Sequence, residues 1–330
     1  MQARVNMPLL LLLLPIFCWQ NVWADPLLSD QIDWLETMAF AAHLTDYSGT
    51  FVYQDGMGGH VQVSRITHVS DIDGEHERLE GLNGSRREII SSNNQIWLLL
   101  GDRRIRIDKQ HTEKTFPTLM PEQINALKEN YLVSQTDEDR VAGFHAHVVV
   151  FQPKDNLRYT HKMWAHSESG LFLKAVVLDE RARVIEQYAF TQLSIGGDVD
   201  RSWIEPNRTE PYGLKTNPAK LAAGTSVSTK PNDWQIDALP SGFKKIKEIC
   251  RPMSDKNTPV THLVFSDGLA AISVFIEDLG SRVDVNLGLS SQGSIQIYSR
   301  INGEKLITVV GEVPPRTVIQ VADSVRYAGQ

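Results

Sequence analysis

Few residues in this sequence have the type and spacing that a reactive site needs. His145 and His147 are alternate residues of a segment that we expect to be a strand, so their imidazoles share one face and suit a metal ion, with His161 as a third ligand on the next strand. The alternating apolar residues around them equally fit an ordinary two-faced strand, and a zinc site needs three or four ligands. We therefore expect no metal site and no cofactor.

Sequence signatures of catalysis are missing from the chain. It contains no Gly-x-Ser-x-Gly, His-Glu-x-x-His or Walker-type Gly-Lys-Ser/Thr motif, and no Gly-x-Gly-x-x-Gly ahead of a helix. The densest glycine cluster, Gly56, Gly58 and Gly59, lies between two expected strands and is typical of a hairpin loop. An enzymatic function is therefore not expected.

Aromatic, aliphatic and arginine side chains in the first part of the chain suit a lipid better than a reaction. A strongly curved, open sheet can leave apolar residues lining a cavity for acyl chains, and guanidinium groups can hold headgroup phosphates. A solid core and a solvated strand edge are the alternative interpretations of the apolar and the basic residues. The candidate lipid-binding residues are Phe51, Tyr53, Trp97, Leu99, Trp164, Phe172, Arg86, Arg87, Arg103 and Arg104.

A second basic cluster lies in the last third of the chain and suits an acidic partner segment. The candidate partner-binding residues are Lys244, Lys245, Lys247, Arg251 and Phe265. Cys250, within the same segment, is the only cysteine outside the first 24 residues. A lone cysteine is more often a small buried apolar residue than a reactive thiol.

The pattern of apolar residues predicts a mainly β (α+β) protein. A three-to-four-residue spacing over residues 28–42 predicts a helix, and from residue 48 the period changes to two, with turn signals such as Asp73-Gly74 and Asn83-Gly84. A short helix is expected over residues 121–131, followed by four more strands. Five further strands follow residue 244, and a last helix begins near Pro315 with the apolar stripe Val318, Val321, Ala322 and Val325.

Targeting and charge set the expected domain organisation. Residues 1–24 combine a basic start, a short apolar run and a Val-Trp-Ala cleavage site, which predicts an export signal peptide. Residues 205–231 lose periodicity and predict a linker between domains at 25–204 and 232–330. The formal charge is -7 for 330 residues, with net -9 on residues 25–204 and +1 on 205–330, which excludes a general affinity for nucleic acid.

Two segments give the chain a resemblance to a known family. These are residues 47–53, Tyr-Ser-Gly-Thr-Phe-Val-Tyr, and residues 264–269, Val-Phe-Ser-Asp-Gly-Leu, with residues 273–277 close behind. In this order, after a signal peptide and a leading helix, they resemble the periplasmic RseB/MucB regulators of the envelope stress response. The resemblance covers essentially the whole chain after the signal peptide.

The resemblance implies a fold and a binding function. It implies an N-terminal LolA/LolB-like open half-barrel with helices and a smaller C-terminal sheet with a packed helix. It also implies that the protein binds the periplasmic region of an RseA/MucA-type anti-sigma factor and protects it from site-1 proteolysis, until lipopolysaccharide or an acyl-chain ligand releases it. A periplasmic lipid or lipoprotein carrier of the LolA type is the alternative, and a homodimer remains open.

Overall fold

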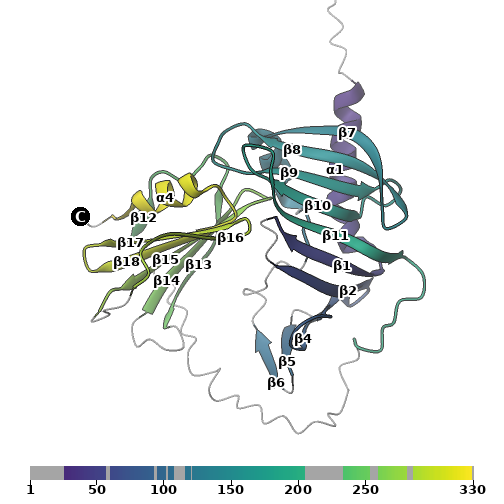
Figure 1. Ribbon diagram of the computed structural model, residues 1–330, viewed down its shortest axis with the longest axis horizontal. Helices are drawn as coiled ribbons and strands as arrows, with labels where there is room; N and C mark the ends of the chain where they lie inside the picture. The colour runs from purple at the N-terminus through teal and green to yellow at the C-terminus, as the bar shows by residue number, and fades with distance from the viewer. Residues whose placement is uncertain are drawn as a thin grey trace, which may run out of the picture.

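The computed structural model describes residues 26–56, 60–92, 95–101, 103–107, 116–119, 121–204, 233–252, 259–280 and 285–328. The expected signal peptide (1–24) and linker (205–231) lie outside these residues. Two antiparallel sheets dominate the fold (Figure 1), so the expectation of a mainly β protein with a large first sheet and a smaller second one is confirmed.

The large sheet contains eleven strands in the described part of the chain. They follow the order β6-β5-β4-β3-β2-β1-β11-β10-β9-β8-β7, so the first and the last strands of this unit pair at its centre. The sheet is open, because β6 and β7 form its two edges. Its strands are β1 Tyr47–Asp55, β2 Val61–Asp71, β3 Gly74–Gly81, β4 Arg87–Ser92, β5 Gln95–Leu100, β6 Arg103–Ile107, β7 Tyr131–Val141, β8 Phe144–Pro153, β9 Thr160–His166, β10 Phe172–Leu178 and β11 Val184–Ile195.

One face of this sheet is covered by helix α1 (Pro26–Leu44), which crosses the strands in Figure 1. The helix buries Leu35, Met38 and Ala39 against the sheet, as the spacing of its apolar residues predicts. A short 3₁₀ turn, η2 (Pro121–Gln123), leads into α2 (Ile124–Asn130), which closes the same core from the side with Ile124 and Leu127. The main core therefore lies between the sheet and these helices.

The central pairing of β1 with β11 explains one glycine of the first family-like segment. A Cβ atom on Gly49 would lie 2.7 Å from both the Gln192 carbonyl oxygen and Phe190 Cε1. No side chain fits there, because real Cβ contacts are longer. The Tyr-Ser-Gly-Thr segment thus reflects close packing at the middle of the sheet.

In the second unit the described residues form a six-stranded antiparallel sheet in the order β13-β14-β15-β18-β17-β16, with helix α4 (Pro315–Asp323) packed on it. Val318, Val321 and Ala322 are fully buried, as expected, but the helix is shorter than predicted. It ends at Asp323, and Val325 begins a short strand that pairs with Ile236. The strands are β12 Trp234–Ile236, β13 Lys244–Pro252, β14 Pro259–Ser266, β15 Ala271–Asp278, β16 Gly288–Gln292, β17 Ile295–Asn302, β18 Lys305–Gly311 and β19 Val325–Tyr327.

Candidate functional site

An aromatic cluster fills the space between α1 and the centre of the large sheet. Phe51 of β1 lies 5.2 Å from Phe116 and 5.8 Å from Phe190, measured between ring centroids, and Phe116 lies 4.8 Å from Phe190. Phe172 of β10 is buried in the same core. These side chains pack on one another and on α1, so a hydrophobic ligand has to displace part of this packing in order to enter.

Tyr53 lies at the rim of the cluster, where it is half-buried. Its ring centroid is 4.9 Å from that of Tyr188. Burial, together with the nearby Glu186 carboxylate, raises the pKa of Tyr53 to about 12, so its hydroxyl stays protonated at neutral pH. The sequence-predicted residues Phe51, Phe172 and Tyr53 therefore do come together.

Trp164 does not share this lining. It is buried on the opposite face of the sheet with Val148 and Leu173, and its indole N–H donates to Asp139 Oδ2 at 2.8 Å. The reason is the alternation of side chains along a strand, which places its neighbours Met163 and Ala165 under α1 and Trp164 outside. A ligand beneath α1 would not meet this ring.

Trp97 and Leu99 lie on β5, four strands from β1, and both are half-buried. They are therefore separated from the aromatic cluster by a long stretch of sheet. The expected lining of the site is therefore shared by Phe51, Tyr53 and Phe172 on β1 and β10. It does not include Trp97 and Leu99 on β5.

The predicted arginines gather at one end of the arm formed by β4, β5 and β6. Register pairs Arg87 with Leu100 and Leu100 with Arg103, which aligns the three strand ends. Arg86 is exposed and lies 4.0 Å from Glu88. The side chains of Arg103 and Arg104 lie outside the described residues. A basic edge is thus present, at a distance from the aromatic cluster.

The predicted partner-binding lysines lie on β13, an edge strand of the second sheet. Lys244 and Lys245 are exposed, and Lys245 Nζ donates to Glu248 Oε2 at 2.6 Å. Lys247 is partly buried, and the side chain of Arg251 lies outside the described residues.

Phe265 is placed differently from the expected anchor. Only 7% of its surface is exposed, and it packs in the core of the second unit. It alternates with the partly buried Val264 and Ser266 on β14 and faces the core, so it stabilises the domain and does not present a ring to a partner.

A buried, hydrogen-bonded polar site lies where the two units meet. Asp267, in the turn after β14, is 1% exposed and accepts hydrogen bonds from the Tyr131 hydroxyl at 2.8 Å and from Arg158 Nε at 2.7 Å, both from the first unit. Arg158 is 2% exposed and also donates to Asp155 Oδ2 at 2.7 Å and to the Ser241 carbonyl. We call Tyr131, Asp155, Arg158 and Asp267 the domain joint.

The backbone of the second family-like segment is shaped for the domain joint. Asp267 Oδ1 accepts from the amides of Leu269 and Ala270 at 3.0 and 2.8 Å, which fixes the turn. Gly268 has φ +105, and a Cβ atom there would lie 3.0 Å from Gln123 Cβ and from Leu127 Cδ2. Leu269 then inserts into the core of the first unit. The Ser-Asp-Gly-Leu segment therefore docks one domain on the other.

Further contacts extend this interface on both sides of the joint. Thr317 Oγ1 donates to the Leu157 carbonyl at 2.9 Å, and Gln296 Nε2 donates to the Tyr159 hydroxyl at 3.3 Å. Burial and the Asp267 carboxylate hold the pKa of Tyr131 well above its usual value, so its hydroxyl remains a donor. A buried pair of this kind favours one arrangement strongly, because separating it would leave a charge without a partner in the interior.

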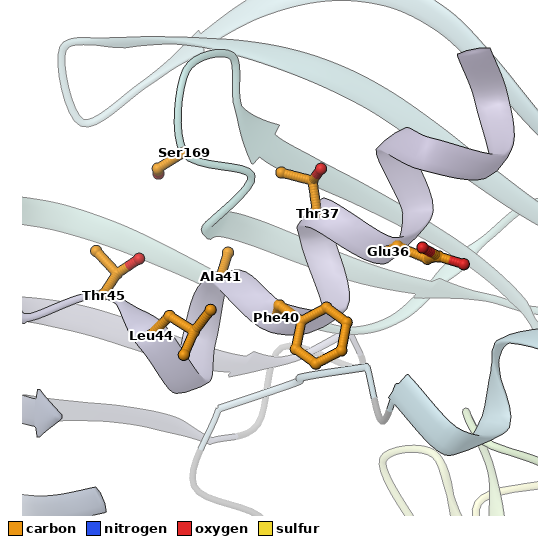
Figure 2. A pocket seen from close by; sticks show the side chains of 7 residues that line it. All are labelled: Glu36, Thr37, Phe40, Ala41, Leu44, Thr45 and Ser169. Carbon is orange, nitrogen blue, oxygen red and sulfur yellow. The ribbon is translucent and has the colours of Figure 1, made fainter. Parts of the chain in front are cut away.

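The outer side of α1 forms an open depression of about 460 Å³ (Figure 2). Phe40 and Leu44 are exposed apolar side chains along it, and Ser169 from the β9–β10 turn forms the opposite wall. It lies on the opposite side of the helix from the aromatic cluster. α1 thus has apolar surface on two sides.

One member of the histidine pair that suggested a metal has other side-chain contacts. His147 packs edge-on against Trp34 of α1, and its Nδ1 lies 3.1 Å from Gln135 Nε2. Within the described residues, no group of three or more His, Cys, Asp or Glu side chains is arranged to hold a metal ion. In the same residues no helix is both long and apolar enough to cross a membrane.

Sequence reasoning did not find the domain joint. Asp267-Gly268 is a dipeptide typical of a turn, but Arg158, the partner of Asp267, is 109 residues away in the chain, and nothing in the local pattern connects the two. The only available signal was the family-like segment that contains Asp267.

Comparison with known proteins assigns both units. The model of the MucB/RseB N-terminal domain matches residues 30–208, and that of the MucB/RseB C-terminal domain matches residues 228–326. The sigma factor AlgU regulatory protein MucB of Pseudomonas aeruginosa is 30% identical over 304 residues, which cover 90% of this chain and 91% of the relative.

Solved structures agree with this assignment. MucB in the Pseudomonas aeruginosa MucA/MucB complex is 29% identical, with a TM-score of 0.70 over 90% of this chain and 99% of that one. A structure of MucB in complex with MucA(peri) is 28% identical, with a TM-score of 0.68 over 89% of this chain and 98% of the other. These relatives are regulatory proteins and not enzymes. The chain belongs to the MucB/RseB family.

Proposed function

We propose that this protein acts in the periplasm as a negative regulator of a sigma-E type envelope stress response. In this proposal it binds the periplasmic domain of a MucA/RseA-type anti-sigma factor and shields that domain from site-1 proteolysis. The observation that carries the proposal is the match over 90% of the chain to MucB in its complex with MucA. Both units take part in that match, which supports a function that needs the whole chain.

The domain joint supports a partner surface of fixed geometry. Arg158 and Asp267 hold the two sheets in one relative orientation, so surfaces on both domains keep a constant spacing. A partner segment that contacts both domains then binds to a preorganised surface, which lowers the entropy that binding costs. We expect the C-terminal unit, residues 232–330, together with the linker, to supply most of that surface.

Release by a lipid is the second part of the proposal. The aromatic cluster beneath α1 is apolar and large. Contacts between apolar groups have little directional preference, so an acyl chain can take the place of part of this packing. Helix α2 connects this region to the joint, because Leu127 is buried in the same core and also lies beside Gly268. Lipopolysaccharide or another acyl-chain ligand that displaces α1 would thus disturb the surface that holds the partner.

The test uses the exported chain and the periplasmic domain of the anti-sigma factor from the same genome. Calorimetric titration should show a complex, and the complex should resist the site-1 protease that cuts the free domain. Adding lipopolysaccharide should release the partner, and the partner should weaken lipopolysaccharide binding by the same factor. Equal partner affinity with and without saturating lipopolysaccharide would remove the release step, and lipid binding without any partner binding would favour the LolA-type carrier.

A further inference from the structure

The two edges of the second sheet differ in how they are protected. Edge strands expose unpaired backbone groups, and proteins commonly guard them with lysines or β-bulges. β13 carries both devices: Lys244 and Lys245 are exposed on it, and its register shifts between Lys245 and Lys247, which leaves Ile246 as the extra residue. This edge is poorly suited to pairing with another strand.

β16, at the opposite edge, has neither device. Its sequence is Gly-Leu-Ser-Ser-Gln, without charge or proline, and it pairs with β17 in continuous register. All five residues are exposed, and Leu289 is 48% exposed. Leu287, just before the strand, is 54% exposed. Among the described residues no strand pairs with the outer side of β16, so this side is an open template for a strand.

An apolar row across the sheet ends at this edge. Cross-strand pairing aligns one residue from each of five strands, and the row packs on the core beneath α4 for most of its length. The row runs through Leu263, Val274, Val309, Tyr298 and Leu289. Every inner member has an apolar neighbour on both sides, whereas Leu289 has one on the Tyr298 side alone. An added strand with an apolar side chain opposite Leu289 would complete the row.

We propose that the free edge of β16 binds an extended segment of the anti-sigma partner as a seventh strand of the second sheet. This inference rests on the proposed function and assigns its contact site. Backbone hydrogen bonds would supply the affinity, and an apolar side chain opposite Leu289 would supply the register. A second copy of the chain fits less well, because antiparallel pairing about the midpoint, Ser290, sets Leu289 opposite a serine.

The first experiment compares matched variants of the full chain by calorimetric titration with the periplasmic domain. Leu289→Lys places a charge on β16, the edge that has neither lysines nor a bulge. Ile246→Lys is the matched control, because Ile246 is also an exposed apolar residue, at 57%, and lies on β13 at the other edge. We expect Leu289→Lys to weaken binding at least tenfold and Ile246→Lys to leave it within about twofold. Both side chains are largely exposed, so the melting temperatures should match that of the unmodified chain.

The second experiment measures backbone amide exchange in residues 288–292. In the complex the amides facing the partner should become protected, while those of β13 should not change. If Leu289→Lys binds the periplasmic domain as tightly as the unmodified chain, and amide exchange in residues 288–292 is the same in the free chain and the complex, the β16 site is wrong. The proposed function would still stand. Protection in the free chain that rises with protein concentration would assign the edge to a second copy and also overturn the site. A chain that does not bind the periplasmic domain at all would overturn the proposed function itself.

Discussion

The aromatic cluster beneath α1 and the domain joint are both buried, but different forces hold them. The cluster consists of rings from β1, β11 and the segment around Phe116, whose contacts have little directional preference. The joint consists of a carboxylate, a guanidinium and a phenol, each with a defined hydrogen bond. Apolar packing of similar volume can replace a ring, whereas no neutral group replaces a buried charge whose partner stays charged. The cluster is thus the adaptable part of the molecule and the joint is the rigid part.

The difference between the rigid joint and the adaptable cluster is tested most strongly by replacing a joint residue with one of nearly the same shape. Asp267→Asn keeps the shape of the side chain but removes the charge that faces Arg158 at 2.7 Å. We expect a loss of about 3 kcal/mol in the free energy of unfolding, because a buried guanidinium loses one of its two carboxylate partners. Urea unfolding followed by circular dichroism measures it. Asp278→Asn, which removes a partner of Lys305 at the surface, is the control and should cost far less. Equal losses in the two variants would show that the joint is not special.

A conservative exchange in the aromatic cluster should have a smaller effect. Phe51→Leu keeps an apolar side chain of similar size in a core that already contains leucine and methionine. We expect it to cost less than about 1.5 kcal/mol, since such exchanges usually allow repacking. The same urea titration checks this value. A loss as large as that of Asp267→Asn would mean that the cluster is as rigid as the joint and is a poor site for a ligand.

Acid should lower the free energy of unfolding through His68, which lies in the region of the aromatic cluster. This side chain stacks on Tyr47, with ring centroids 5.2 Å apart, and burial lowers its pKa below the usual value. Below the unfolded-state pKa of about 6.5 the unfolded chain binds a proton that the folded chain does not, so stability falls as the pH decreases through this window. His68→Gln should flatten the dependence measured by urea unfolding between pH 7 and 5. His166, whose pKa burial also lowers, should leave a residual slope. An unchanged slope in His68→Gln would exclude His68 as the cause.

Most of the fold could be predicted from periodicity, and the failures have physical causes. Strands in which buried and less buried residues alternate, such as β8, could be predicted from periodicity. β7 was missed because its middle, Thr-Asp-Glu-Asp-Arg, is exposed on both faces at an edge and has no alternation to detect. β16 was missed for the same reason. The periodicity of apolar residues along the chain reflects which side chains are buried. An edge strand that is exposed on both faces therefore shows little of this periodicity.

The candidate sites were harder to predict than the fold, because a site depends on contacts between distant residues. The face that Phe51 and Phe172 share follows from strand register, which local pattern does not fix for strands from opposite ends of the domain. The joint requires Tyr131, Arg158 and Asp267 to meet across two units. The lining was therefore predicted in part, because Phe51, Tyr53 and Phe172 come together whereas Trp97, Leu99 and Trp164 do not. The joint was not predicted.

The smallest expected effect concerns the lysines of β13. Replacing Lys244, Lys245, Lys247 and Arg251 with serine removes charges from a guarded edge where Lys245 already pairs with Glu248. If the partner's strand binds at β16, these charges act only at a distance, by steering an acidic segment toward the domain. Association should then slow and become less sensitive to salt, while the dissociation rate stays close to that of the unmodified chain. Stopped-flow mixing at several salt concentrations separates the two rates. A large increase in the dissociation rate would place the contact on β13 and exchange the roles of the two edges.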